Sequence, residues 1–283
     1  MQLADVARGA LSGGDRDTRL ITWNVARRSS GIVEQATALA ARHPSIVALQ
    51  EVTRQTFPLW RHAFALMGLS HFRTSLDAAD PAREPAARRR TGVMLAARAP
   101  LVDVERPLDV PWPETSLCAA TGTPHGLVDI FCVHVPNAAN GQVKVQTLQG
   151  IRDGLTDAPP SPRVVCGDLN TPRRELTTGE VLSFARDSRG RLRRERGSEW
   201  DEAELGVVPG LSELGYRDAY RSLHGYARSE PSWTWKRIAG HDGGWRIDHV
   251  FVSVQLQPVA CVYHHAWREH GLSDHSALEV DFH

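Results

Sequence analysis

The chain has 283 residues and a formal net charge of zero, because 33 basic side chains balance 33 acidic ones. A hydrophobic content of 41% allows a sizeable core and argues against global disorder. No apolar run approaches the roughly 20 residues of a membrane span, and the N-terminus does not look like a secretion signal. We therefore expect no membrane partner, and nothing in the sequence indicates an obligate protein partner.

The four cysteines form no C-x-x-C pair, and Cys132 and Cys166 lie inside apolar runs. This pattern favours buried, reduced thiols over a zinc site. Reduced thiols are typical of the cytoplasm, so we expect a cytoplasmic protein.

Strands and helices are predicted to alternate along the chain. Short runs rich in Val, Ile and Leu predict buried strands at residues 19–25, 46–50, 91–98 and 127–135. Helical spacing of apolar residues predicts helices over residues 31–42, 57–67 and 143–155. We expect residues 1–17 to form a flexible N-terminal arm and residues 18–283 to form one domain.

A basic segment at residues 181–196 interrupts this alternation. Its pattern predicts a β-hairpin around the turn Asp187-Ser188-Arg189-Gly190. The second arm of this hairpin carries Arg191, Arg193 and Arg194. Two interpretations remain open: a solvated protrusion with no particular role, or a basic finger beside the active groove that touches phosphates.

Polar side chains stand where several of the apolar runs stop. They are Asn24, Glu51, His134, Asn137, Asp168, Asn170, Asp248, Asp274 and His275. Strand ends are rigid platforms for loops, and chemistry is usually built there. A shared site of carboxylates, histidines and asparagines would suit a hard divalent cation and a phosphate ester.

The chemistry of phosphodiester hydrolysis explains why these residue types matter together. A water must be deprotonated and aimed, and the charge on the phosphoryl oxygens must be neutralised. Carboxylate and amide oxygens bind Mg²⁺ or Mn²⁺ well, whereas thiolates and clustered imidazoles favour zinc or copper. The candidate ligands are oxygens, so we expect Mg²⁺ or Mn²⁺ as the cofactor.

The motifs WN, QE, GDLN, WRIDH and SDH occur here in the order found in the endonuclease/exonuclease/phosphatase superfamily. The chain resembles most its exonuclease III class of apurinic/apyrimidinic (AP) endonucleases, through VPNAANGQVKVQTLQGI and WTWK followed by GWRID. The likeness covers residues 19–283 apart from 70–90 and 181–196. It implies a deoxyribonuclease I-like α/β (α+β) fold, a four-layer sandwich of two mainly antiparallel β-sheets flanked by helices.

The resemblance implies a metal site and a phosphate contact. Glu51 would hold the divalent metal, with Asn24 and Asp274 near it. Asn137 would donate a hydrogen bond near the phosphate side of the groove.

The resemblance also implies the catalytic groups. Asp168 would orient or deprotonate the attacking water, and Asn170 would hold the phosphate or that water. His275 would face the scissile phosphate, while Asp248 fixes its tautomer and raises its basicity. AP endonucleases of this class usually have a tyrosine where this chain has His134, and a histidine is more like deoxyribonuclease I, sphingomyelinases and other branches. It can stabilise the phosphorane or protonate a leaving group.

Aromatic residues discriminate between substrates. Trp233 and the expected pocket residues Trp235, Trp245 and Ile247 match the region where AP endonucleases enclose a flipped-out sugar that lacks its base. The alternative is ordinary core packing of large aromatic side chains.

We expect a divalent-metal-dependent phosphodiesterase that hydrolyses DNA, as an AP endonuclease or an exonuclease III-like nuclease. The alternative is a phosphoesterase of the same fold acting on RNA, nucleotides, inositol phosphates or phospholipid head groups, which His134 and the zero net charge support. A second alternative is a non-catalytic binding module on this fold. Such a module would lack residues equivalent to Glu51, Asp168 or His275, and all three are present.

Overall fold

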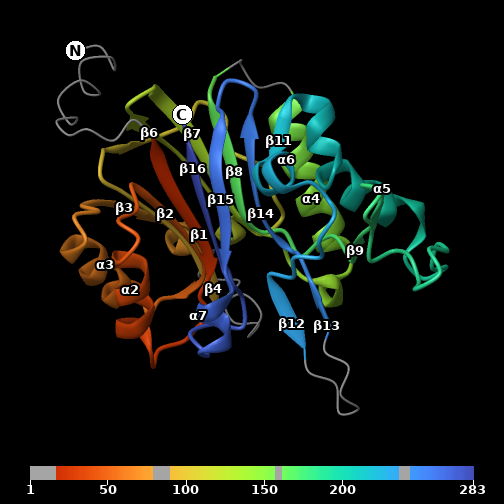
Figure 1. The fold of residues 1–283 in the computed structure, drawn as a ribbon, viewed down its shortest axis with the longest axis horizontal. Helices are drawn as coiled ribbons and strands as arrows, with labels where there is room; N and C mark the ends of the chain where they lie inside the picture. Colours follow the sequence, from red (N-terminus) through yellow and green to blue (C-terminus); the bar gives the residue numbers. More distant parts are fainter. Residues whose placement is uncertain (1–16, 79–89, 157–160, 236–242) are drawn as a thin grey trace.

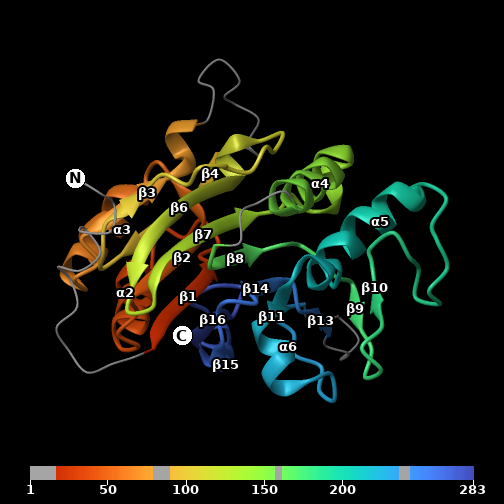
Figure 2. The same ribbon diagram turned by 90° about the horizontal axis from the view of Figure 1, so that it is seen from above.

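The computed structural model describes residues 17–78, 90–156, 161–235 and 243–283, so the arm predicted for residues 1–17 lies outside them except for Asp17. Two six-stranded sheets pack face to face, and helices cover their outer faces (Figures 1 and 2). The predicted four-layer sandwich is confirmed. None of the described helices is long and apolar enough to cross a membrane.

The first sheet has the strand order β15-β16-β1-β2-β4-β3, and helices α2 and α3 pack on its outer face. Its strands are β1 Thr18–Asn24, β2 Ile46–Thr53, β3 His71–Thr74, β4 Thr91–Ala97, β15 Pro258–His264 and β16 Ala277–Phe282. The helices are α2 Ile32–Ala40 and α3 Phe57–Leu66. Successive β1 residues alternate between the layers: Leu20 faces the second sheet, and Ile21 faces the helices.

The second sheet has the order β11-β14-β8-β7-β6-β5, and helices α4 and α5 pack on its outer face. Its strands are β5 Leu101–Val102, β6 Ser116–Thr123, β7 Gly126–His134, β8 Arg163–Asp168, β11 Tyr216–Asp218 and β14 Asp248–Ser253. The helices are α4 Gln142–Thr156 and α5 Gly197–Val207. The remaining elements are α6 Ala219–His224, α7 His265–Glu269, the strand pair β9 Arg174–Glu175 with β10 Val181–Leu182, and the strand pair β12 Trp233–Trp235 with β13 Gly243–Trp245.

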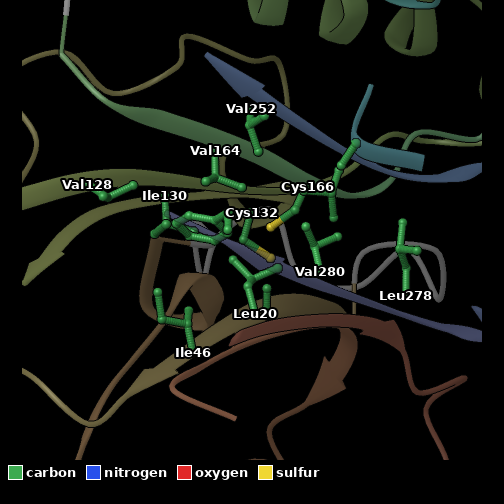
Figure 3. Close-up of a cluster of buried hydrophobic side chains, with 14 of the residues drawn as sticks. Leu20, Ile46, Val128, Ile130, Cys132, Val164, Cys166, Val252, Leu278 and Val280 are labelled. Carbon is green, nitrogen blue, oxygen red and sulfur yellow. The ribbon is translucent and has the colours of Figure 1, made fainter. Parts of the chain in front are cut away.

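The core between the two sheets consists of inward-facing side chains from both. Leu20 and Ile46 of the first sheet meet Ile130 and Val164 of the second (Figure 3). Cys132 and Cys166 lie side by side in this core, since β7 and β8 pair in register at these positions. Both cysteines are buried, as the sequence predicted.

Strand direction gathers the predicted site residues at one edge of the sandwich. β1 and β2 run parallel in the first sheet, and β7 and β8 run parallel in the second, so four strands end at this edge. β14 and β16 run antiparallel to β8 and β1, so both begin there. Residues that precede or follow these strands therefore converge from distant parts of the sequence.

The hairpin predicted for residues 181–196 is wrong in its extent. The turn forms where expected, and Gly190 takes a left-handed φ of 78°. The first arm does not pair with the second, because β10 pairs with β9 instead and only Arg186 bridges to Leu192. Carboxylates of α5 explain the difference: the Phe184 N–H donates to Glu204 at 2.7 Å.

Candidate active site

Three neighbouring strands place His134, Asp168 and Asp248 in one row. His134 ends β7 beside Asp168 at the end of β8, and Asp168 lies opposite Asp248 at the start of β14. Gly167 makes this close approach possible. Its φ is 136°, and a Cβ atom at this position would lie 2.0 Å from the Val133 carbonyl oxygen. A glycine is therefore required immediately before Asp168.

Asp168 is a buried carboxylate held by two asparagines. Asn24 donates to its Oδ2 at 3.0 Å, and the Asn170 backbone N–H donates to its Oδ1 at 2.9 Å. Burial raises the pKa of Asp168, although the nearby charges of His275 and His134 oppose this shift. The carboxylate is therefore more basic than an exposed aspartate, which suits a group that accepts a proton from water.

His275 is fixed by Asp248. Its Nδ1 lies 2.8 Å from Asp248 Oδ2, and its Nε2 lies 3.8 Å from Asp168 Oδ2. Burial alone would lower the pKa of His275, but the charges of Asp248 and Asp168 outweigh it and raise the pKa to about 10. The imidazole is therefore protonated near neutral pH and presents a positive charge beside Asp168.

A fixed strand-end loop supports Asn170. Its backbone has a φ of 50°, which a non-glycine residue rarely adopts, and its carbonyl oxygen accepts from Lys144 at 2.8 Å. Lys144 also pairs with Glu204 at 2.6 Å, and both side chains are fully buried. A buried ion pair between α4 and α5 thus holds the loop that carries Asn170.

Glu51 lies across the site from Asp168. It sits in a bulge of β2 with a φ of 60°, and both carboxylates approach the same His134 nitrogen. His134 Nε2 lies 3.8 Å from Glu51 Oε1 and 3.7 Å from Asp168 Oδ2. The second oxygen of Glu51 forms an ion pair with Arg27, whose Nε lies 3.0 Å away.

The donors present fit a hard divalent cation at Glu51 better than at the Asp168–Asp248–His275 group. Potential ligand atoms of that group lie within 4.8 Å of one another, but Asp248 and Asp168 raise the pKa of His275 to about 10, whereas an imidazole that binds a metal must be neutral. Glu51 and Asp274 both line the cavity, and Glu51 Oε1 accepts no hydrogen bond from any described residue. This remaining set contains oxygen donors, which Mg²⁺ and Mn²⁺ prefer.

These groups surround one cavity of about 580 Å³. The predicted residues that line it are Glu51, His134, Asn137, Asp168, Asn170, Trp245, Ile247, Asp274 and His275. Asn24 and Asp248 lie behind this wall, where both are 1% exposed and bond to Asp168 and His275. Asn137 also caps the short 3₁₀ helix Ala138–Asn140, because its side chain accepts from the Ala139 N–H.

The aromatic ribbon β12–β13 forms one wall of the cavity. Trp233 and Trp245 stack with ring centroids 5.1 Å apart, and Trp233 Nε1 donates to Asp274 at 3.1 Å. Trp235 does not line this cavity; its ring packs against both Trp233 and Trp245 and lines a neighbouring cavity. Gly243 permits this packing, since a Cβ atom there would lie 2.2 Å from the Trp235 ring.

The predicted basic residues lie away from the cavity lining. Arg191, Arg193 and Arg194 belong to the loop between β10 and α5, which extends along one side of the molecule (Figures 1 and 2). Arg191 is exposed and pairs with Asp187 at 3.0 Å. Any contact of these arginines with a substrate would lie beyond the cavity itself.

Sequence reasoning missed several residues of the cavity lining, among them Arg27, Thr91, Trp112, Glu114 and Thr115. Arg27 follows the strand-end Asn24 by three residues, so its position was a usable signal. Trp112 and its neighbours follow a proline-rich stretch without a recognised motif, and only the fold brings them to this edge.

Comparisons with known proteins agree with this architecture. The model of the Endonuclease/Exonuclease/phosphatase family matches residues 21–275. An AP endonuclease from Archaeoglobus fulgidus superposes with a TM-score of 0.67 at 22% identity, over 93% of this chain and 98% of that one. An endonuclease/exonuclease/phosphatase from Beutenbergia cavernae has a TM-score of 0.62 at 19% identity, over 95% and 72%.

TDP2 from D. rerio, solved in complex with a single-strand DNA product, has a TM-score of 0.62 at 15% identity and covers 95% of this chain and 100% of its own. Comparison with curated protein sequences gave no match. At these identities the solved structures establish the fold alone. The family model, however, matches most of the chain, and its match spans the strand-end residues from Asn24 to His275. The chain therefore belongs to the endonuclease/exonuclease/phosphatase family.

Proposed function

We propose that this protein is a divalent-metal-dependent phosphodiesterase that hydrolyses DNA. One observation carries the proposal: at one cavity the buried Asp168 lies 3.8 Å from His275 on one side, and on the other side His134 separates it from a second carboxylate, Glu51. Hydrolysis of a phosphate ester requires a base, a positive charge and an oxygen ligand for the metal, all facing the same cavity.

We assign a part in this reaction to each residue of the catalytic group. Asp168 accepts the proton of the attacking water, and its hydrogen bonds from Asn24 and Asn170 fix the direction of its free lone pairs. His275 places its positive charge against the phosphoryl oxygens, where negative charge grows in the transition state. Asp248 keeps the imidazole oriented and protonated.

Glu51 and Asp274 would hold the divalent cation, which would neutralise charge on the phosphate and the leaving oxygen. The side chain of Asp274 is oriented by the Trp233 N–H, and Glu51 by its bulge in β2. His134 lies between Glu51 and Asp168 and can donate a hydrogen bond to a phosphate oxygen or to the leaving group.

DNA is favoured by features around the cavity. Trp245, Ile247 and Asn137 line it, and an aromatic wall suits a sugar or base taken out of its stack. The similar folds include an AP endonuclease and a TDP2 bound to a single-strand DNA product. We therefore propose incision at abasic sites or exonucleolytic trimming.

A second candidate, a phosphoesterase for a non-DNA substrate, is favoured by one observation. Trp233 and Trp245 stack on each other with an interplanar angle of 14°, and Trp235 lies outside the cavity. The tryptophan rings therefore occupy part of the space that the expected aromatic pocket would need. A smaller ester, such as a nucleotide or an inositol phosphate, needs no such pocket.

A substrate panel with chelator controls separates these candidates. It contains abasic duplex, intact duplex, single-stranded DNA, RNA, inositol phosphates and sphingomyelin, each with Mg²⁺, Mn²⁺ or excess EDTA. We expect metal-dependent cleavage of abasic or single-stranded DNA, which Trp245→Ala reduces more than it reduces hydrolysis of a small diester. Trp235→Ala, on the same ribbon but outside the cavity, should have the smaller effect.

Hydrolysis of only the non-DNA esters, with no effect of Trp245→Ala, would favour the second candidate. Full activity in EDTA would contradict the metal requirement. A protein that binds DNA with Mg²⁺ but cleaves nothing in the panel would instead be a binding module on this fold.

A further inference from the structure

Arg27 stands in an unusual turn directly after the strand-end Asn24. Ala26 and Arg27 have φ values of 55° and 56°, a left-handed pair that non-glycine residues rarely form. Asn24 helps to hold the turn, because its Oδ1 accepts from the Ala26 N–H at 3.0 Å. Such strained backbone persists when the surroundings enforce it, and it is concentrated at functional sites.

This turn directs Arg27 into the candidate active site. Its side chain lines the cavity, and its Nε lies 3.0 Å from Glu51 Oε2. Among the residues that the structure describes, Arg27 is the only arginine or lysine in the cavity lining. It therefore supplies the permanent positive charge nearest to the carboxylate that would hold a divalent cation.

The Arg27–Glu51 pair is placed so that it can be exchanged. The Arg27 side chain is 59% exposed and that of Glu51 is 18% exposed. Ion pairs in such exposed positions are weak, because water screens the charges and the long side chain loses entropy when it is held. The Lys144–Glu204 pair, with both side chains at 0% exposure, has no such freedom.

We propose that Arg27 is an exchangeable countercation: it neutralises Glu51 in the free protein, yields Glu51 to the divalent cation, and then binds a phosphate oxygen of the substrate. This inference rests on the proposed phosphodiesterase function and adds a residue and an order of events to it. The geometry requires no backbone movement, since a rotation of the exposed side chain is enough to leave Glu51.

The chemistry of the guanidinium group supports the second half of the proposal. Its planar fork of N–H donors matches two phosphate oxygens, and arginine cannot lose its charge at neutral pH. In the described part of the cavity lining, the other basic side chains are the imidazoles of His134 and His275. A guanidinium released from Glu51 would add a charge-assisted contact at the mouth of the cavity.

Metal binding without substrate tests whether Arg27 competes with the divalent cation for Glu51. Free Mn²⁺ is measured by electron paramagnetic resonance during titration of wild type, Arg27→Gln and Arg28→Gln. Arg28 is an exposed neighbour outside the cavity lining, so its variant removes the same charge without touching Glu51. We expect Arg27→Gln to bind Mn²⁺ about two- to fivefold more tightly than Arg28→Gln, because it removes a weak competitor of the metal.

Phosphate binding tests whether Arg27 then binds a phosphate oxygen. Here the same substitution should weaken binding, whereas it should strengthen Mn²⁺ binding. Inorganic phosphate is titrated by calorimetry against the same proteins in saturating Mg²⁺. We expect Arg27→Gln to weaken phosphate binding about tenfold, as for loss of one charge-assisted hydrogen bond, and Arg28→Gln to leave it near wild type. Arg27→Lys keeps the charge but not the fork, so it should fall between the two.

Tighter metal binding together with weaker phosphate binding in one variant is not expected from misfolding, and Arg28→Gln controls for the loss of one positive charge. Equal Mn²⁺ affinities of the two glutamine variants, weaker Mn²⁺ binding by Arg27→Gln, or no Mn²⁺ binding by wild type would overturn the exchange. Unchanged phosphate affinity would overturn the transfer to substrate. Neither titration measures turnover, so an inactive wild type would defeat the proposed function while these results still decide the role of Arg27.

Discussion

Two carboxylate clusters lie near each other at the start of β14, and they are built for opposite purposes. Arg246 precedes this strand and joins Glu175 and Asp218 in what we call the arginine cluster. Two residues later, Asp248 joins Asp168 through His275 in the catalytic cluster. Nearly every carboxylate in the two clusters is buried, so burial alone does not distinguish them.

The difference lies in how completely the carboxylates are paired. Glu175 receives both Arg246 and Arg221, with contacts as short as 2.6 Å, and the pKa of Glu175 falls to about 2 despite its burial. Asp168 receives amide and histidine neighbours instead, and burial raises its pKa. Asp248 Oδ1 is buried and has no hydrogen-bond partner among the residues that the structure describes.

This contrast separates structural acids from reactive ones. An acid whose lone pairs are all filled by guanidinium groups stabilises the fold and cannot accept a proton at neutral pH. An acid that is buried without full compensation costs stability but keeps its basicity, as catalysis requires. Substitutions in the two clusters should therefore affect opposite properties.

The largest expected effect is on turnover, from Asp168→Asn. Loss of the proton acceptor should lower kcat by about 10³-fold, within the usual range for general acid–base catalysis. Stability should stay within about 1 kcal/mol of wild type, because removal of a buried charge offsets one lost hydrogen bond. Single-turnover kinetics and denaturant unfolding measure the two properties. If Asp168→Asn lost stability but kept wild-type turnover per folded molecule, Asp168 would be a structural acid rather than a reactive one.

The next effect is on stability, from Glu175→Gln. It leaves two buried guanidinium groups with one fewer carboxylate, which should cost about 3 kcal/mol at neutral pH. The free energy of unfolding is measured with denaturant. Glu213→Gln is the matched control, since Glu213 pairs with Arg152 at 69% exposure and should change stability little.

The lowered pKa of Glu175 fixes how its contribution to the free energy of unfolding changes with pH. The folded-state pKa of Glu175 is about 2 and its ordinary value is 4.5, so its stabilisation is complete above pH 4.5 and is lost as pH falls towards 2. The difference in unfolding free energy between wild type and Glu175→Gln should therefore shrink in that window. A constant difference from pH 7 to pH 2 would show that the charge of Glu175 is not the cause.

The smallest expected effect is on the salt dependence of DNA binding, from arginines that lie outside both clusters. If Arg191, Arg193 and Arg194 contact DNA phosphates, replacing all three with glutamine should lower the slope of log affinity against log salt by roughly 0.9 per contact. Turnover of a small diester should stay near wild type. Arg61→Gln on the opposite helix α3 provides a single-charge control. An unchanged slope would make this loop a solvated protrusion.

Much of the site was predictable because its signals are local. Apolar runs define strands, and the polar residue after each run defines a strand end, so Asp168 and Glu51 could be assigned without coordinates. The predicted hairpin at residues 181–196 was wrong because Asp201 and Glu204, on a later helix, bond to its first arm. Such long-range competition leaves no periodic signal in the sequence.

The same limit applies to the aromatic residues and to Arg27. The sequence assigns both Trp235 and Trp245 to the pocket, but only Trp245 lines the cavity, while the Trp235 ring packs closely over Gly243. Arg27 looks like an ordinary loop arginine until its left-handed backbone and its contact with Glu51 are known. Side-chain direction in irregular turns is set by tertiary contacts, which residue type alone does not encode.

The strand directions have a practical consequence for handling the molecule. β1 runs towards the cavity and β16 runs away from it, so the first and last described residues meet at the opposite edge of the sandwich. His283 Nδ1 lies 3.4 Å from Asp17 Oδ1 there. A dye, bead or surface coupled at position 283 would leave the cavity directed away from the support, which is the orientation that immobilised and single-molecule assays need.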